Sequence, residues 1–90
     1  MYYFYVLQSL KKKEWFYKGS TINLIKRLQK HNNGQVKSTK PYAPLRVVYY
    51  EAYLDKESAI AREMSVKKSG SVWTPLMKRV RKSLMKEKYL

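Results

Sequence analysis

The stretch that decides the fold is Y17-K-G-S-T-I-N-L-I-K-R-L-Q-K-H31, in which a short aromatic strand passes through a glycine into an amphipathic helix. Ser20 or Thr21 is a suitable N-cap for this helix, and Gly34, after two asparagines, is a suitable residue to end it. The sequence therefore predicts one helix between these two signals. It also predicts that the helix follows directly on an aromatic strand.

The predicted helix has one apolar face and carries an arginine and the only histidine of the chain beside that face. Leu24, Leu28 and His31 recur at helical spacing. Residues three and four positions apart are neighbours on a helix, so Arg27 and His31 lie together at the edge of the buried stripe. We expect both side chains to face the strand that carries Tyr17.

The composition describes one small, strongly basic domain. The chain has 90 residues, and a domain of this size buries only about 60–65% of the surface of its unfolded chain, so we expect a shallow, open site. The formal net charge is +14, and basic residues are spread along the whole sequence. Such a field attracts polyanions. We therefore expect a nucleic acid as partner, DNA first and RNA not excluded.

The sequence also restricts the compartment. It contains no cysteine, which rules out disulfides and thiolate zinc sites and fits a reducing cytoplasm. The apolar run 2–7 is too short for a signal peptide, and no stretch reaches transmembrane length. A basic amphipathic C-terminal helix could also lie on an anionic membrane, but charge elsewhere favours packing on the domain, and we expect no membrane partner. The oligomeric state is left open.

The first part of the chain is predicted to form a hairpin. The aromatic run 2–8 is typical of a strand covered on both faces, and residues 14–18 form a second short strand. A tight lysine-rich turn between them would place Tyr5 roughly opposite Tyr17.

The remaining chain is predicted to contain a basic loop, a third strand and two helices. The expected architecture is α/β (α+β) in the order ββαβαα, with a three-stranded antiparallel sheet flanked by helices. Prolines exclude regular structure from the loop. The two helices are expected to begin at residue types that are preferred at helix N-termini. The predicted single domain spans residues 1–90, with a core over 2–70. The loop is expected at 34–45, the third strand at 46–53 and a helix from Asp55 to Gly70. A basic amphipathic helix is expected at 74–88, with Thr74 as its cap and Pro75 as its first residue.

Glu63 is the most informative acidic residue. Its helical neighbours include Ala59, Ile60 and Val66, so its carboxylate lies beside core positions. A carboxylate in such a place is costly unless it is paired or binds a cation. Two interpretations remain open at this point: an ion pair, with Lys67 or Arg27, or a cation-binding site.

Two tyrosines and the histidine are candidates for proton transfer. Tyr5 and Tyr17 flank Gly19, where the backbone can approach another group closely. A phenol has a pKa near 10, and nearby cations would lower it enough for proton transfer. His31 can serve either as a general base or as a cap stabilised by the helix dipole. A metal would have to rest on one carboxylate, waters and substrate oxygens.

In their order and spacing, these residues resemble the GIY-YIG endonuclease superfamily. Tyr3-Phe4-Tyr5 and Tyr17-Lys18-Gly19 stand at the two tripeptides, and the helix with Arg27 and His31 and the later helix with Glu63 follow. The similarity covers residues 2 to about 70. It is greatest to small single-domain members that resemble the GIY-YIG nuclease domain of excinuclease.

The resemblance implies a role for each residue. Glu63 would hold Mg²⁺ or Mn²⁺, and Arg27 would contact the scissile phosphate. Tyr5 resembles the general base for water or its relay, Tyr17 a second tyrosine that orients the nucleophile, and Gly19 the close-approach position. His31 matches a histidine that accepts a proton from tyrosine in some members.

The implied activity is metal-dependent cleavage of phosphodiester bonds in DNA, structure-selective or nonspecific and serving DNA repair. The first tripeptide lacks the Gly and Ile of the family, and Lys18 replaces an apolar residue. The alternative function is a nucleic-acid-binding module that is catalytically idle or needs a partner. The residues expected to contact nucleic acid are Lys18, Gly19, Lys26, Lys37, Lys40, Arg46 and Lys67.

Overall fold

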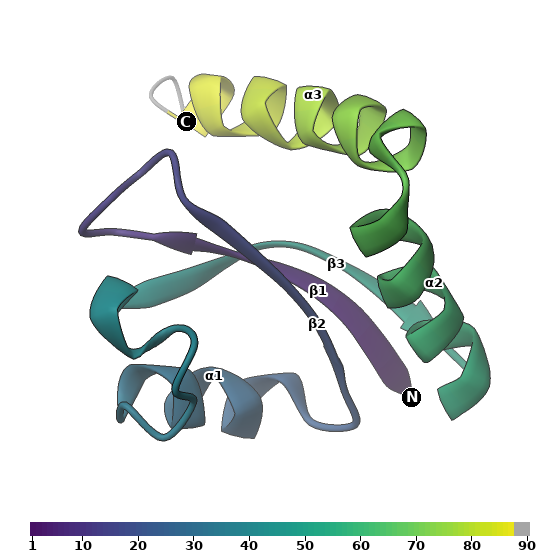
Figure 1. Ribbon diagram of the computed structural model, residues 1–90, viewed down its shortest axis with the longest axis horizontal. Coiled ribbons are helices and arrows are strands. Elements are labelled where there is room, and N and C mark those ends of the chain that lie inside the picture. The colour runs from purple at the N-terminus through teal and green to yellow at the C-terminus, as the bar shows by residue number, and fades with distance from the viewer. Residues whose placement is uncertain (88–90) are drawn as a thin grey trace.

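The computed structural model describes residues 1–87 and contains one antiparallel sheet of three strands in the order β2-β1-β3. One helix lies on one side of the sheet and two lie on the other (Figure 1). This confirms the predicted architecture. The elements are β1 (Tyr2–Ser9), β2 (Phe16–Thr21), α1 (Leu24–Asn32), a short 3-10 helix (Lys40–Tyr42), β3 (Leu45–Tyr53), α2 (Lys56–Lys68) and α3 (Gly70–Lys86).

The central strand β1 is buried on both faces, as its continuous apolar run predicts. Phe4 and Val6 pack against α2 and α3 in the larger core. Tyr5 and Leu7 point to the opposite face, in a second cluster with Leu24 and other residues. The sheet therefore separates two cores, and the polar tip of Tyr5 belongs to the smaller one, under α1.

Strand β2 differs from the prediction for residues 14–18. It extends over Phe16–Thr21, so Gly19 lies inside the strand, and Tyr5 pairs with Gly19 instead of lying opposite Tyr17. The cause is a longer connection at the hairpin tip, where the Ser9 amide donates to the Trp15 carbonyl at 3.1 Å. The two-residue shift preserves the face on which each side chain lies, because strands have a period of two.

The boundaries of α1 were partly predicted. Asn23 is the N-cap, in place of Ser20 or Thr21, and its side chain accepts a hydrogen bond from the Lys26 amide. The two earlier residues are still paired with β1, which prevents them from capping a helix. Gly34 has a φ of +74° just past the helix end, which confirms it as the terminating glycine.

The last two helices follow one another almost without a break. Asp55 caps α2 as predicted. The prediction that Thr74 caps α3 is wrong, because the helix begins at Gly70 with Ser69 at its N-cap position, and Pro75 lies inside it. Pro75 lies beyond the first turn, so its missing amide removes one hydrogen bond of the helix. The predicted end at residue 88 lies outside the described residues. No helix within residues 1–87 has the length and apolar character to cross a membrane.

Candidate active site

The phenol of Tyr5 reaches the site by crossing over Gly19 of the neighbouring strand. The two residues are paired across β1 and β2. A Cβ atom built on Gly19 would lie 2.5 Å from the Tyr5 hydroxyl oxygen and 2.6 Å from Cζ. Only glycine leaves room for this ring, so the close approach predicted for Gly19 is made to Tyr5.

A chain of hydrogen bonds continues from Tyr5 into the protein. The Tyr5 hydroxyl lies 2.9 Å from His31 Nε2, and His31 Nδ1 lies 2.7 Å from Thr39 Oγ1. The Thr39 hydroxyl in turn donates to the Val36 carbonyl at 3.3 Å, so it accepts from the Nδ1–H of His31. This arrangement places the imidazole proton on Nδ1. Nε2 is then an acceptor for the proton of the Tyr5 hydroxyl.

Arg27 completes the cluster from the same helix. Its Nε donates to the Tyr5 hydroxyl oxygen at 3.4 Å. The ring of Tyr17 lies 5.1 Å from that of His31 and 6.4 Å from that of Tyr5, measured between centroids. The structure therefore brings together the arginine, the histidine and both tyrosines that the sequence singled out.

Burial determines the protonation states in this cluster. It raises the pKa of Tyr5 to about 12, although the hydrogen bond from Arg27 acts in the opposite direction. Arg27 thus acts in the predicted direction, but burial outweighs it, so the expected fall of this pKa is wrong for the protein alone. Burial, followed by the charge of Arg27, lowers the pKa of His31 to about 4. A neutral imidazole does not suit a cationic helix cap, and the general-base interpretation of His31 stays a prediction.

Glu63 lies on the other side of β2 and is held by two partners. Its Oε1 accepts from the Ser20 hydroxyl at 2.6 Å, and its Oε2 pairs with Lys67 Nζ at 2.5 Å. The ion pair predicted as one alternative is thus present, with Lys67 and not with Arg27. The charge of Glu63 makes only a minor contribution to the raised pKa of Tyr5, which burial dominates.

The surroundings of Glu63 fit a divalent cation held mainly by the substrate. Within residues 1–87, no three His, Cys, Asp or Glu side chains group into a metal site. The carboxylate side chain is 20% exposed and forms an ion pair with the ammonium group of Lys67. Mg²⁺ often rests on one or two carboxylates, waters and phosphate oxygens. Glu63 is the residue that would hold it.

The other residues predicted to contact nucleic acid are distributed differently. Lys18 Nζ lies 4.0 Å above the Trp73 ring, and burial followed by the charge of Lys67 lowers its pKa. Arg46 does not join the cluster, because its guanidinium forms a two-point ion pair with Glu87 on α3. The predicted contacts Lys26 on α1, Lys37 in the following loop and Lys40 in the short 3-10 helix are all exposed.

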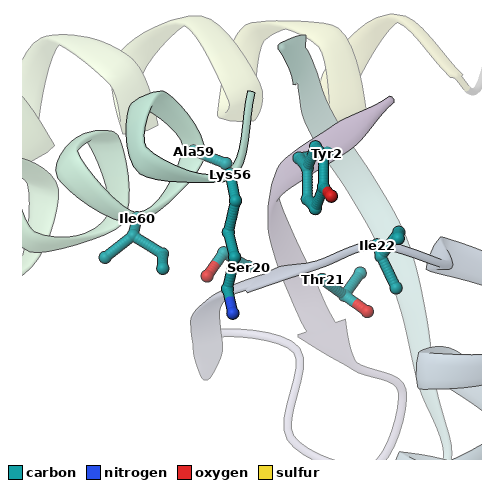
Figure 2. Close-up of a pocket in the computed structure, with 7 residues that line it drawn as sticks. All are labelled: Tyr2, Ser20, Thr21, Ile22, Lys56, Ala59 and Ile60. Carbon is teal, nitrogen blue, oxygen red and sulfur yellow. The ribbon is translucent and has the colours of Figure 1, made fainter. Parts of the chain in front are cut away.

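An open pocket of about 270 Å³ lies between the end of β2 and the first half of α2. Figure 2 shows Ser20 and Lys56 on one side of it and Tyr2 and Thr21 on the other. Ser20 is the hydrogen-bond donor to Glu63, so this pocket and the carboxylate share a wall. The open shape agrees with the shallow site expected for a domain of this size.

Sequence reasoning missed three residues that position the site. Thr39 fixes the imidazole and Ser20 holds Glu63, while Asn32 exchanges two hydrogen bonds with the backbone of Leu45, at 2.7 and 3.0 Å, and so ties the end of α1 to β3. Strand alternation after Gly19 could have placed Ser20 on the α2 face. No local pattern marks Thr39 or Asn32, because both act on residues that only the fold brings near.

Comparison with known proteins agrees with the geometry. The model of the GIY-YIG catalytic domain matches residues 1–73. A UPF0213 protein of Pediococcus pentosaceus is 39% identical over 67 residues, which cover 73% of this chain and 68% of the relative. A UPF0213 protein of Clostridium perfringens is 42% identical over 69 residues, covering 76% and 72%. One of Streptococcus pyogenes is 40% identical over 67 residues, covering 73% and 71%.

Proposed function

This chain belongs to the GIY-YIG family, and from that premise we propose that it is an endonuclease that hydrolyses phosphodiester bonds in DNA with Mg²⁺ or Mn²⁺ as cofactor. One observation carries the proposal: the hydrogen-bonded chain from Arg27 through Tyr5 to His31 and Thr39. Burying these polar groups costs free energy unless they are hydrogen-bonded. Their order suits the transfer of a proton next to a phosphate group.

The proton moves along the chain in two coupled transfers. Water gives its proton to the Tyr5 oxygen while Tyr5 passes its own proton to Nε2 of His31, and the resulting hydroxide forms a bond to phosphorus. The bond from phosphorus to the leaving sugar oxygen breaks, and that oxygen takes a proton from solvent water. Because the pKa of Tyr5 is about 12 and that of His31 about 4, a phenolate does not form beforehand. Thr39 orients the imidazole by accepting a hydrogen bond from its Nδ1–H group. General-base assistance of this kind contributes about 10²- to 10⁴-fold.

Charge at the phosphate is balanced from two sides. Arg27 lies against the Tyr5 oxygen and stabilises negative charge that builds up there and on the phosphate. Glu63 would hold the divalent cation, which, when bound, neutralises phosphate oxygens and lowers the pKa of coordinated water. Tyr17 packs edge-on against the His31 ring and limits its movement.

The proposed substrate is DNA cleaved with little sequence preference, in a structure-selective or nonspecific manner and in the service of repair. The basic side chains next to the site are mainly lysines, which bind phosphates without reading bases. Two arginines elsewhere, Arg46 and Arg62, are engaged in ion pairs with glutamates. A comparison of cleavage on branched, linear and single-stranded DNA, and on RNA, separates these possibilities.

The proposal is tested by nicking of supercoiled plasmid with Mg²⁺ or Mn²⁺. Wild type should nick only with added metal. Arg27→Ala and Glu63→Gln should lose at least 100-fold, because each removes a charge that acts at the phosphate. Lys30→Ala and Glu57→Gln are matched controls, since they remove exposed charges from the same two helices, and they should retain activity.

Binding measurements on the same proteins distinguish the endonuclease from the alternative function, a nucleic-acid-binding module. A wild type that binds plasmid, branched DNA and RNA but cleaves none of them with either metal would show a binding module instead of an enzyme. Equal nicking by Glu63→Gln and wild type would show that the metal assignment is wrong. Circular dichroism of each variant establishes that the fold is retained.

A further inference from the structure

The ion pair between Lys67 and Glu63 occupies the position at which the proposed function needs a metal ion. The two residues are four positions apart on α2, and their contact is 2.5 Å. The second carboxylate oxygen is taken by the Ser20 hydroxyl. A divalent cation that binds Glu63 must therefore replace the ammonium group or share the carboxylate with it.

The surroundings of Lys67 favour its movement towards an anion. Its side chain is 44% exposed, compared with 20% for Glu63, so the ammonium can leave while the carboxylate stays in place. Lys67 Nζ lies 6.0 Å from the centre of the ring of Tyr17, one of the candidate catalytic tyrosines. Its charge also lowers the pKa of Lys18, after burial, so a second ammonium group is near enough to repel it.

We propose that Lys67 neutralises Glu63 in the free protein and transfers to a phosphate group when DNA binds, so that DNA and the divalent cation bind with positive coupling. This inference rests on the proposed function and adds an order of events to it. The ammonium and the cation compete for one carboxylate, while the phosphate and the carboxylate compete for one ammonium. Each ligand therefore improves the binding of the other, and by the same factor.

The size of the coupling is limited by the strength of the ion pair. Partly exposed pairs four residues apart on a helix are weak, because water and salt screen them and the lysine loses side-chain entropy. We expect removal of Lys67 to tighten cation binding by about two- to fivefold. A larger factor would require a more deeply buried pair.

The test measures Mn²⁺ binding by electron paramagnetic resonance of the free ion. Wild type and Lys67→Met are each titrated alone and with a short duplex whose phosphorothioate linkages resist hydrolysis. Lys67→Met should bind Mn²⁺ about two- to fivefold more tightly than wild type without DNA. The duplex should then improve Mn²⁺ binding more for wild type than for Lys67→Met, because the variant has no ion pair to release.

Two further variants separate a specific effect from a general one. Lys68→Met removes the adjacent exposed charge and should leave both the Mn²⁺ affinity and the coupling close to wild type. Similar changes in Lys68→Met and Lys67→Met would reduce the effect to net charge and overturn the inference. Equal coupling in wild type and Lys67→Met would overturn it as well.

Glu63→Gln distinguishes this inference from the function on which it rests. If Mn²⁺ binds wild type and Glu63→Gln equally well, the metal assignment fails and the inference falls with it. If binding requires Glu63 but does not respond to Lys67→Met, the nuclease proposal stands and only the exchange of partners is refuted.

Discussion

The neutral, buried imidazole of His31 makes a sharp prediction about stability and pH. His31 has no exposed surface, and its pKa falls from 6.5 to about 4 because of burial and the charge of Arg27. Between these two values the unfolded chain binds a proton that the native protein excludes. The stabilising contribution is therefore complete above pH 6.5 and is lost as the pH falls towards 4.

The magnitude follows from proton linkage. One pKa unit corresponds to about 1.4 kcal/mol, so the complete loss is about 3 kcal/mol, and the loss between pH 7 and pH 5.5 is about 1 kcal/mol. The carboxyl pKa values of Glu51, Asp55 and Glu87 are lowered in the folded protein. These groups are ionised above pH 5.5 in both states, so the histidine dominates this window.

Urea unfolding followed by tryptophan fluorescence at pH 7 and pH 5.5 measures the effect. Wild type should lose about 1 kcal/mol more than His31→Gln over this interval, whatever their stabilities at pH 7. Because the chain has one histidine, its Cε1 proton resonance gives an independent check in wild type and should not shift until the pH approaches 4. Equal losses in both proteins, or a titration midpoint near 6.5 in the folded protein, would refute the assignment of a neutral buried His31.

Three other perturbations have defined outcomes. Gly19→Ala should reduce plasmid nicking at least tenfold and cost about 1–3 kcal/mol in urea unfolding, because its Cβ would collide with the phenol of Tyr5; unchanged nicking would show that the phenol need not cross this position. Asn23→Ala should cost about 1 kcal/mol of unfolding free energy by removing the cap of α1, and a loss under 0.3 kcal/mol would contradict the role of the cap. If about six phosphates are contacted, the DNA affinity should fall with salt along a log–log slope near −5, measured by fluorescence anisotropy; a flat dependence would count against binding through phosphates.

The sequence predicted those parts of the fold whose signals are local. The apolar run of β1, the cap at Asp55 and the stop at Gly34 each depend on a few adjacent residues, and all three are confirmed. The full extent of β2 was not predicted, because the sequence Gly19-Ser20-Thr21 suggests a turn. Pairing with the central strand overrides that preference.

The site was predicted as a set of residues but not as a network. Helical spacing correctly placed Arg27 beside His31, and the structure joins both to Tyr5. The pKa of Tyr5 was predicted to fall and instead rises, because burial depends on packing that the sequence does not specify. Thr39 was not predicted, because its contact with the imidazole depends on the path of a loop.

Tyr5 on the central strand and Lys67 on a surface helix should move on very different timescales. Strand β1 is hydrogen-bonded on both sides, so its amides should exchange with solvent only when the whole domain unfolds. Lys67 stands on a surface helix with nearly half of its side chain in solvent, and such side chains change rotamer within nanoseconds. The oxygen proposed to receive the proton of water therefore keeps its place for as long as the domain stays folded, while the charges around it can rearrange within each encounter with DNA.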